Sequence, residues 1–149
     1  MRYHEIMIET IIPAVPRLYH GTPAYRYEKI KHEGLVPSSV SAPKNPPGIY
    51  LSHQMSMAVH YAEMGFGEDT HVPWVILAID GSQLDPAKLV PDTGQEMDLN
   101  FDELLARGYT SEQLRAGEFP WWVSLDEIGQ VIYRGHISPH LINVVKHIA

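Results

Sequence analysis

Apolar and polar residues alternate along the chain in runs that predict short strands and helices. Residues 74–79, Trp-Val-Ile-Leu-Ala-Ile, are apolar throughout and predict a strand buried on both faces. Shorter apolar runs predict further strands at 6–12, 17–20, 48–51, 121–123 and 130–133, and a last strand or helix within 136–148. Apolar residues at helical spacing predict helices at 24–33, from Ser52 onward, at 101–107 and at 110–116.

Cap and turn residues set the ends of these elements. Thr22 and Pro23 combine an N-cap hydroxyl with a proline at the first helical position, and Gly34 predicts the end of that helix. Residues 36–47 contain four prolines and three serines and predict a loop, of the kind that often covers a cleft. Residues 84–100 are also predicted to be mostly loop.

Length and composition indicate one domain over residues 1–149. Hydrophobic residues make up 44% of the chain, which is ample for a core. The absence of cysteine excludes disulfides, thiolate catalysis and cysteine zinc sites. Glu5 and Glu9 interrupt the first apolar run, as a signal peptide would not, and no segment approaches a membrane span in length. We therefore expect a cytoplasmic protein with no membrane partner.

Charge and histidine spacing disfavour two kinds of site. A net charge of −7, with eleven scattered Lys and Arg residues, opposes general nucleic-acid binding. His136 and His140 have the spacing of helical metal ligands, but Pro139 between them breaks the helix. His53 and His60 share a helical face without a third ligand nearby in sequence. We therefore expect no metal.

Two short motifs and one further tyrosine carry the candidate chemistry. Residues 18–22 read Leu-Tyr-His-Gly-Thr, residues 48–52 read Gly-Ile-Tyr-Leu-Ser, and Tyr61 follows Tyr50 by eleven residues. In this order they resemble His-Tyr-type ADP-ribosyltransferases, the branch that includes poly(ADP-ribose) polymerase catalytic domains and rifampin ADP-ribosyltransferases. The resemblance covers residues 17–79 well and the remainder in outline. It implies an α+β fold in which two bent, mainly antiparallel sheets form an NAD cleft flanked by short helices.

The resemblance also implies roles for particular residues. Transfer of ADP-ribose breaks the bond between ribose C1′ and the nicotinamide nitrogen through a transition state that resembles an oxocarbenium ion. The enzyme must hold nicotinamide and polarise the ribose hydroxyls. By resemblance NAD is the substrate, and the roles are His20 for the ribose, Gly21 for the carboxamide, Thr22 for the adenosine side, the rings of Tyr50 and Tyr61 for the nicotinamide, and Ser52 for the cleft wall.

The third catalytic residue departs from the family pattern. In the polymerase-like pattern a Glu heads a late strand, whereas the matching strand here begins with Gln130. A neutral amide can hydrogen-bond the ribose 2′-hydroxyl but cannot accept a proton, which favours single transfer over chain elongation. Glu127 fills the role if the strand starts earlier, and Asp85 is a further alternative, although both also fit solvated loop carboxylates.

Three functions are compatible with these residues. The first is transfer of mono-ADP-ribose to an unidentified protein, nucleic acid or small molecule. The second is a weak or inactive module that binds NAD or ADP-ribose, and Gln130 supports it. The third is an RNA 2′-phosphotransferase, a similar fold with a His-Gly-Thr, which however favours His at the position of Tyr50 and needs several arginines. For the first, we expect the side chains of His20, Tyr50 and Tyr61 to converge in one cleft.

Overall fold

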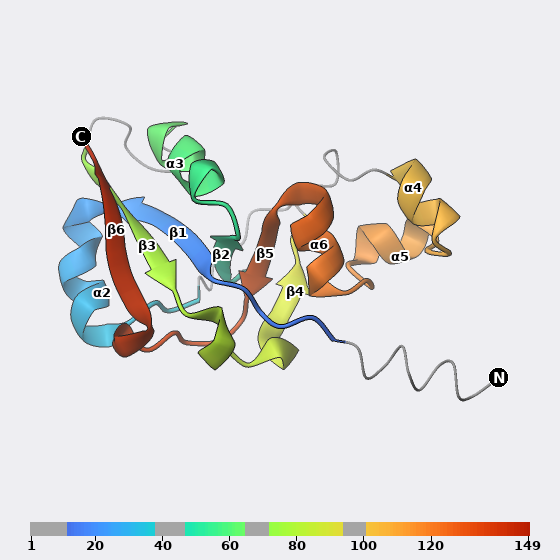
Figure 1. The fold of residues 1–149 in the computed structure, drawn as a ribbon, viewed down its shortest axis with the longest axis horizontal. Coiled ribbons are helices and arrows are strands. Elements are labelled where there is room, and N and C mark those ends of the chain that lie inside the picture. Colours follow the sequence, from blue (N-terminus) through green and yellow to red (C-terminus); the bar gives the residue numbers. More distant parts are fainter. Residues whose placement is uncertain (1–11, 38–46, 65–71, 94–100) are drawn as a thin grey trace.

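The computed structural model describes residues 12–37, 47–64, 72–93 and 101–149. In these residues six strands form one antiparallel sheet in the order β4-β5-β2-β1-β3-β6 (Figure 1). The strands are β1 (Leu18–Pro23), β2 (Ile49–Ser52), β3 (Trp74–Ile79), β4 (Leu89–Pro91), β5 (Gln130–Tyr133) and β6 (Ile142–Ile148). The α-helices are α2 (Tyr27–Glu33), α3 (Met55–Met64), α4 (Phe101–Ala106), α5 (Ser111–Ala116) and α6 (Trp121–Ile128). The predicted α+β class is confirmed.

The sheet narrows at its centre, between β1 and β2. These strands are joined at a single register position, where Tyr19 faces Ser52. By contrast, β1 pairs with β3 and β2 pairs with β5 along their whole lengths. Two separate sheets were expected, and the structure instead has one sheet made of two three-stranded halves, β4-β5-β2 and β6-β3-β1, because the Tyr19 and Ser52 pair keeps the halves connected.

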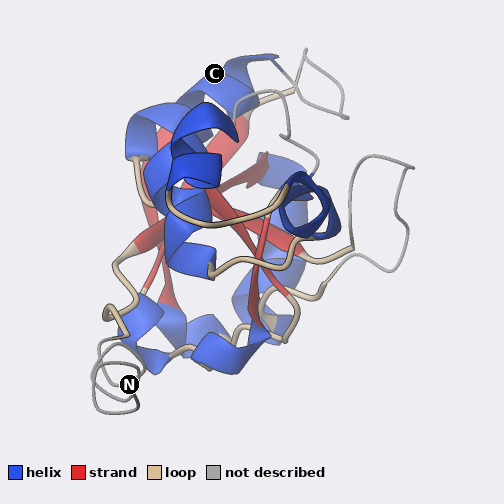
Figure 2. Cartoon of the chain, turned by 90° about the vertical axis from the view of Figure 1, so that its right-hand side faces the viewer, coloured by secondary structure: helices blue, strands red, loops and turns tan. Residues whose placement is uncertain are grey.

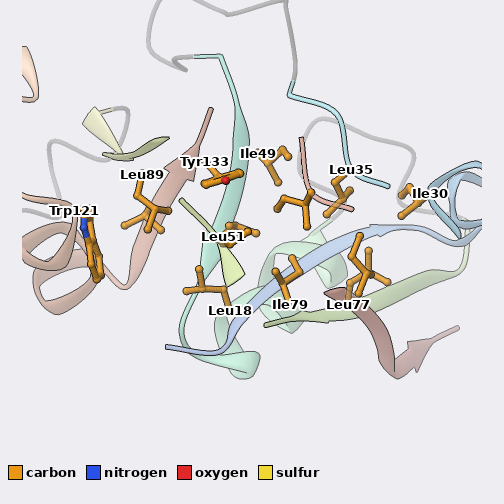
Figure 3. Close-up of a cluster of buried hydrophobic side chains, with 14 of the residues drawn as sticks. Leu18, Ile30, Leu35, Ile49, Leu51, Leu77, Ile79, Leu89, Trp121 and Tyr133 are labelled. Carbon is orange, nitrogen blue, oxygen red and sulfur yellow. The ribbon is translucent and has the colours of Figure 1, made fainter. Parts of the chain in front are cut away.

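Separate apolar clusters cover the two faces of the sheet. The main cluster gathers side chains of β1, β2, β3 and β5, together with Ile30 of α2 and Trp121 and Leu125 of α6 (Figure 3). On the opposite face Ala58 and Ala62 of α3 pack against β3.

A third cluster joins α4 and α5 to the outer side of α6, and includes Leu104, Leu114 and Val123. Figure 2, viewed from the end of the molecule that carries α4 and α5, shows helices in front of the strands. The helices α4 to α6 therefore extend the core beyond the edge of the sheet that carries β4.

Several elements agree with the sequence predictions because local signals determine them. The strand at residues 74–79 is confirmed and is buried along its whole length. Helix α2 ends at Gly34, whose φ of 81° suits glycine. Helix α5 begins at Thr110, whose hydroxyl accepts from the N–H of Gln113 in a capping box.

Other predictions were wrong because distant pairing overrode the local signal. Thr22 does not cap the predicted helix, since it continues β1 opposite Val75 of β3. The helical segment begins at Ala24, as predicted, but its first turn is a 3-10 turn without a side-chain cap. Residues 121–123 form the first turn of α6 and not a strand. Strand β4 lies in the segment predicted as loop. Most of the predicted strand at 6–12 and of the predicted loop at 36–47 lies outside the described residues.

Candidate functional site

His20 lies on β1, one residue beyond the position at which the two halves of the sheet join. Its Nδ1 atom is 2.8 Å from the backbone oxygen of Tyr50 on β2. Because a carbonyl oxygen only accepts, Nδ1 carries the hydrogen and donates it. The Nε2 atom of the neutral ring therefore presents a lone pair.

Burial sets the charge state of His20. The pKa of the half-buried imidazole is lowered from its usual value of 6.5, chiefly by desolvation and further by the charge of Arg26, while the hydrogen bond to Tyr50 opposes the shift. His20 is therefore neutral at pH 7, which makes it an acceptor for a hydroxyl hydrogen at Nε2.

A pocket of about 560 Å³ opens beside His20, between β1, α2 and the start of β2. Its lining consists of His20, Thr22, Tyr25, Arg26, Lys29, Ile30, Glu33, Gly34, Leu35, Val36, Gly48 and Ile49. The Arg26 guanidinium lies over the Tyr25 ring, 5.7 Å from its centroid. Lys29 forms an exposed ion pair with Glu33, with 3.8 Å between Nζ and Oε2, which contributes little to stability. The pocket is thus lined by two cations, one carboxylate and an aromatic ring.

Tyr50 and Gly21 lie on the other face of the sheet from this pocket. Ile49 and Leu51 belong to the main apolar cluster, so strand alternation places Tyr50 between them on the opposite face. A Cβ atom on Gly21 would lie 3.2 Å from the backbone oxygen of Ala58 in α3. Glycine therefore allows α3 to pack directly against β1 on the face that Tyr50 shares.

The predicted residues thus meet at the junction of the sheet halves, but the pocket formed by the described residues takes in only some of them. His20 and Thr22 line the pocket next to α2, whereas Tyr50 and Tyr61 do not. Tyr61 is half-buried on α3, which packs on the face of Gly21. The expected convergence of three side chains in a single cleft is therefore not seen in the described residues. His20 and Tyr50 instead approach the junction from two faces.

Gln130 opens β5 directly opposite Ser52, which ends β2. Residues directly opposite each other on paired strands point to the same side of the sheet, so Gln130 and the buried Ser52 lie on one side. Tyr50 lies on that side too, because it is two residues from Ser52 along β2. The Gln130 side chain is only 7% exposed, and its Oε1 atom has no hydrogen-bond partner in the described part of the chain. An unsatisfied buried amide oxygen costs about 1–3 kcal/mol, so this atom favours a bound donor.

The two alternative acids lie elsewhere. Glu127 belongs to α6 and its Oε1 lies 3.7 Å from Arg107 Nη2. It does not head β5, because Gly129, with a φ of 78°, ends the helix immediately before the strand. Asp85 is exposed, and its Oδ1 accepts from the N–H of Ala87 at 3.0 Å. Both carboxylates thus have local structural roles.

The sequence predictions missed Asp92, which they included only in the loop predicted at residues 84–100. This residue is 0% exposed and follows Pro91, which pairs with Val131 of β5. Its backbone N–H donates to Ser124 Oγ at 3.1 Å. Burial raises the pKa of Tyr50 to about 12, and the negative charge of Asp92 contributes to that rise. The signal in the sequence that could have indicated Asp92 is an acidic residue directly after the apolar run Leu-Val-Pro.

Two further kinds of feature are not found in the described ranges. No three His, Cys, Asp or Glu side chains there are grouped as metal ligands would be. None of the helices in those ranges is long and apolar enough to cross a bilayer.

No protein-family model, curated protein or solved structure matches this chain. Its function is therefore inferred from the geometry of the site.

Proposed function

We propose that this chain is an NAD-dependent ADP-ribosyltransferase that transfers a single ADP-ribose unit to an acceptor. The observation that carries the proposal is the contact between His20 Nδ1 and the Tyr50 backbone oxygen at the junction of the sheet halves. That contact separates two chemically different surfaces, a pocket with two cations and a face that carries Tyr50 and Gln130. NAD has the same division, with anionic ADP at one end and a flat aromatic ring at the other.

The pocket beside α2 suits the ADP half of NAD. Arg26 and Lys29 provide positive charge for a pyrophosphate, and planar guanidinium groups bind phosphate oxygens in pairs. The Tyr25 ring is 62% exposed at the pocket, where it can stack on an adenine. The Nε2 lone pair of His20 would accept from a ribose hydroxyl.

The opposite face suits the nicotinamide half. No register pair joins β1 to β2 beyond Tyr19, so the backbone groups of β1 on that side need other partners. The N–H and C=O groups on this edge of β1 would pair with a carboxamide, which both donates and accepts. The rings of Tyr50 and Tyr61 would flank the pyridinium, whose positive charge favours aromatic faces.

The chemistry then follows from Tyr50 and Gln130. With a pKa of about 12 the Tyr50 hydroxyl remains protonated at neutral pH and acts as a donor. The Gln130 Oε1 atom would accept from the ribose 2′-hydroxyl and stabilise the developing cation. Because an amide takes no proton from the nucleophile, this arrangement favours single transfer over chain elongation.

A second candidate function is NAD binding without turnover. It is favoured by the amide of Gln130, which stands at the head of β5 where the family pattern has an acid.

The proposal is tested with purified full-length protein and NAD labelled in its adenylate phosphate. We expect NAD binding by calorimetry and transfer of label to one fraction of a cell extract. Arg26→Gln should lower the affinity for NAD about tenfold, which corresponds to the loss of one charge-assisted hydrogen bond. Lys146→Gln, on the exposed edge of β6, is the matched control and should leave NAD affinity unchanged.

The possible outcomes separate the candidates. Absence of NAD binding would overturn the proposal. Binding without transfer of label identifies the second candidate. NAD-dependent loss of phosphate from a 2′-phosphorylated RNA, without labelling of the extract, identifies the RNA 2′-phosphotransferase.

A further inference from the structure

We propose that Asp92 supplies the negative charge that Gln130 lacks, as a positioning residue that acts through Tyr50 and Gln130. The inference rests on the proposed function. It concerns a residue that directly follows β4, whereas the family pattern has its acid at the head of the strand that corresponds to β5. It also explains how a site headed by an amide can retain turnover.

The strand register brings Asp92 beside Gln130. Pro91 of β4 faces Val131 of β5, so the next residue along the chain, Asp92, lies next to Gln130. Gln130 in turn faces Ser52 of β2. Asp92, directly after the end of β4, therefore extends the row that Gln130 and Ser52 form across the sheet, at the end where β2 joins β1.

Strand alternation also places Asp92 on the correct face. Leu89 of β4 belongs to the main apolar cluster, so Asp92, three positions on, falls on the opposite face. Tyr50, Ser52 and Gln130 occupy that same face. The carboxylate thus lies on the side of the sheet assigned to nicotinamide.

The hydroxyl of Ser124 fixes Asp92 relative to Gln130. Ser124 Oγ accepts from the Asp92 N–H at 3.1 Å and donates to the Gln130 backbone oxygen at 2.5 Å. A side chain of α6 thereby bridges the residue that follows β4 and the first residue of β5. Ser124 and Asp92 are both fully buried, so these hydrogen bonds are shielded from water.

The charge of Asp92 also acts on Tyr50, in addition to the effect of burial. Its negative charge opposes formation of a phenolate, which is one reason that the pKa of Tyr50 is raised. The same potential must favour a positive charge at that place. An oxocarbenium ion that develops next to Tyr50 would therefore be stabilised by Asp92 without direct contact.

Asp92→Asn tests the inference, because it removes the charge and keeps the shape. For NAD hydrolysis we expect kcat to fall about tenfold with KM unchanged, the pattern for an interaction made mainly in the transition state. Asp126→Asn, an exposed carboxylate on α6, is the matched control and should change neither constant. Wild-type kcat in folded Asp92→Asn would overturn the inference.

A second readout does not depend on turnover. Titration of tyrosine labelled with carbon-13 at Cζ, with Tyr50→Phe as the assignment control, should give a lower Tyr50 midpoint in Asp92→Asn. An unchanged midpoint would count against the inference even if wild-type protein binds NAD without hydrolysing it. Absence of NAD binding in the wild type would instead count against the proposed function.

The double variant Asp92→Asn with Gln130→Glu restores one carboxylate to the row. We expect its kcat to return to at least the wild-type level, which a purely structural role of Asp92 would not explain. If Asp92→Asn alone does not fold, this variant replaces it in the test. A folded double variant without turnover, compared with an active wild type, would overturn the inference.

Discussion

The Nδ1 atom of His20 donates to the backbone oxygen of Tyr50 across 2.8 Å, just beyond the position where β1 and β2 stop pairing. A side chain thus continues the connection between the two halves of the sheet after the backbone ladder has ended. Since Nδ1 is used in this way, a second proton at Nε2 would place a positive charge in a buried site near Arg26. The junction is therefore sensitive to acid.

The free energy of unfolding should fall as the pH is lowered, because His20 takes up a proton more readily in the unfolded chain. Its folded-state pKa lies below 6.5, so the unfolded chain binds the proton first as pH falls. The contribution of neutral His20 to the free energy of unfolding is therefore complete above about pH 6.5. Below that pH it is lost, by at most about 1.4 kcal/mol per pH unit. Urea unfolding at several pH values should show a steeper acid loss for wild type than for His20→Gln. His140→Gln, an exposed histidine, should retain the wild-type slope. Equal slopes for wild type and His20→Gln would contradict this expectation.

Tyr61 should contribute a stacking face to NAD. Tyr61→Ala is expected to weaken the binding of NAD by about 1–3 kcal/mol, the usual cost of losing one aromatic stacking partner. Tyr61→Phe keeps the ring and should change affinity little. Calorimetry measures both variants, and identical affinities for wild type and Tyr61→Ala would show that the ring only packs.

Gln130 should control rate more than binding. Gln130→Glu is expected to raise the rate of NAD hydrolysis, because a carboxylate stabilises a developing cation better than an amide does. Gln130→Ala should lower kcat with little change in NAD affinity. Glu127→Gln is the control, since Glu127 lies on α6 near Arg107, and it should leave kcat unchanged. A silent Gln130→Ala together with an inactive Glu127→Gln would reverse the assignment.

Ser124 should be important for stability. Ser124→Ala leaves the Asp92 N–H and the Gln130 carbonyl without their shared hydroxyl, and each buried unpaired group costs about 1–3 kcal/mol. Urea unfolding should therefore show a loss of at least about 1 kcal/mol. Ser82→Ala removes an exposed hydroxyl that donates to Asp80 and should cost less than about 0.5 kcal/mol. Comparable losses in the two variants would argue against the buried bridge.

The sequence by itself determined the elements whose signals are local. The uniformly apolar run at 74–79 allows only a fully buried strand, and it is β3. Thr110 and Gly34 fix helix ends through hydrogen bonds and a left-handed φ that involve only nearby residues. Gln130 was likewise correctly placed at the head of a late strand.

Only the tertiary structure decided how these elements combine into a site. Thr22 continues a strand despite its helix-start signal, because β3 offers it a partner more than fifty residues away. Strand alternation at the narrow junction separates His20 from Tyr50 onto two faces, which a list of motifs does not reveal. Asp92 gains its significance from Gln130 and Ser124, to which only the register of β4 and the position of α6 bring it close. Sequence patterns report neighbours along the chain, whereas burial, pairing and electrostatic coupling depend on neighbours in space.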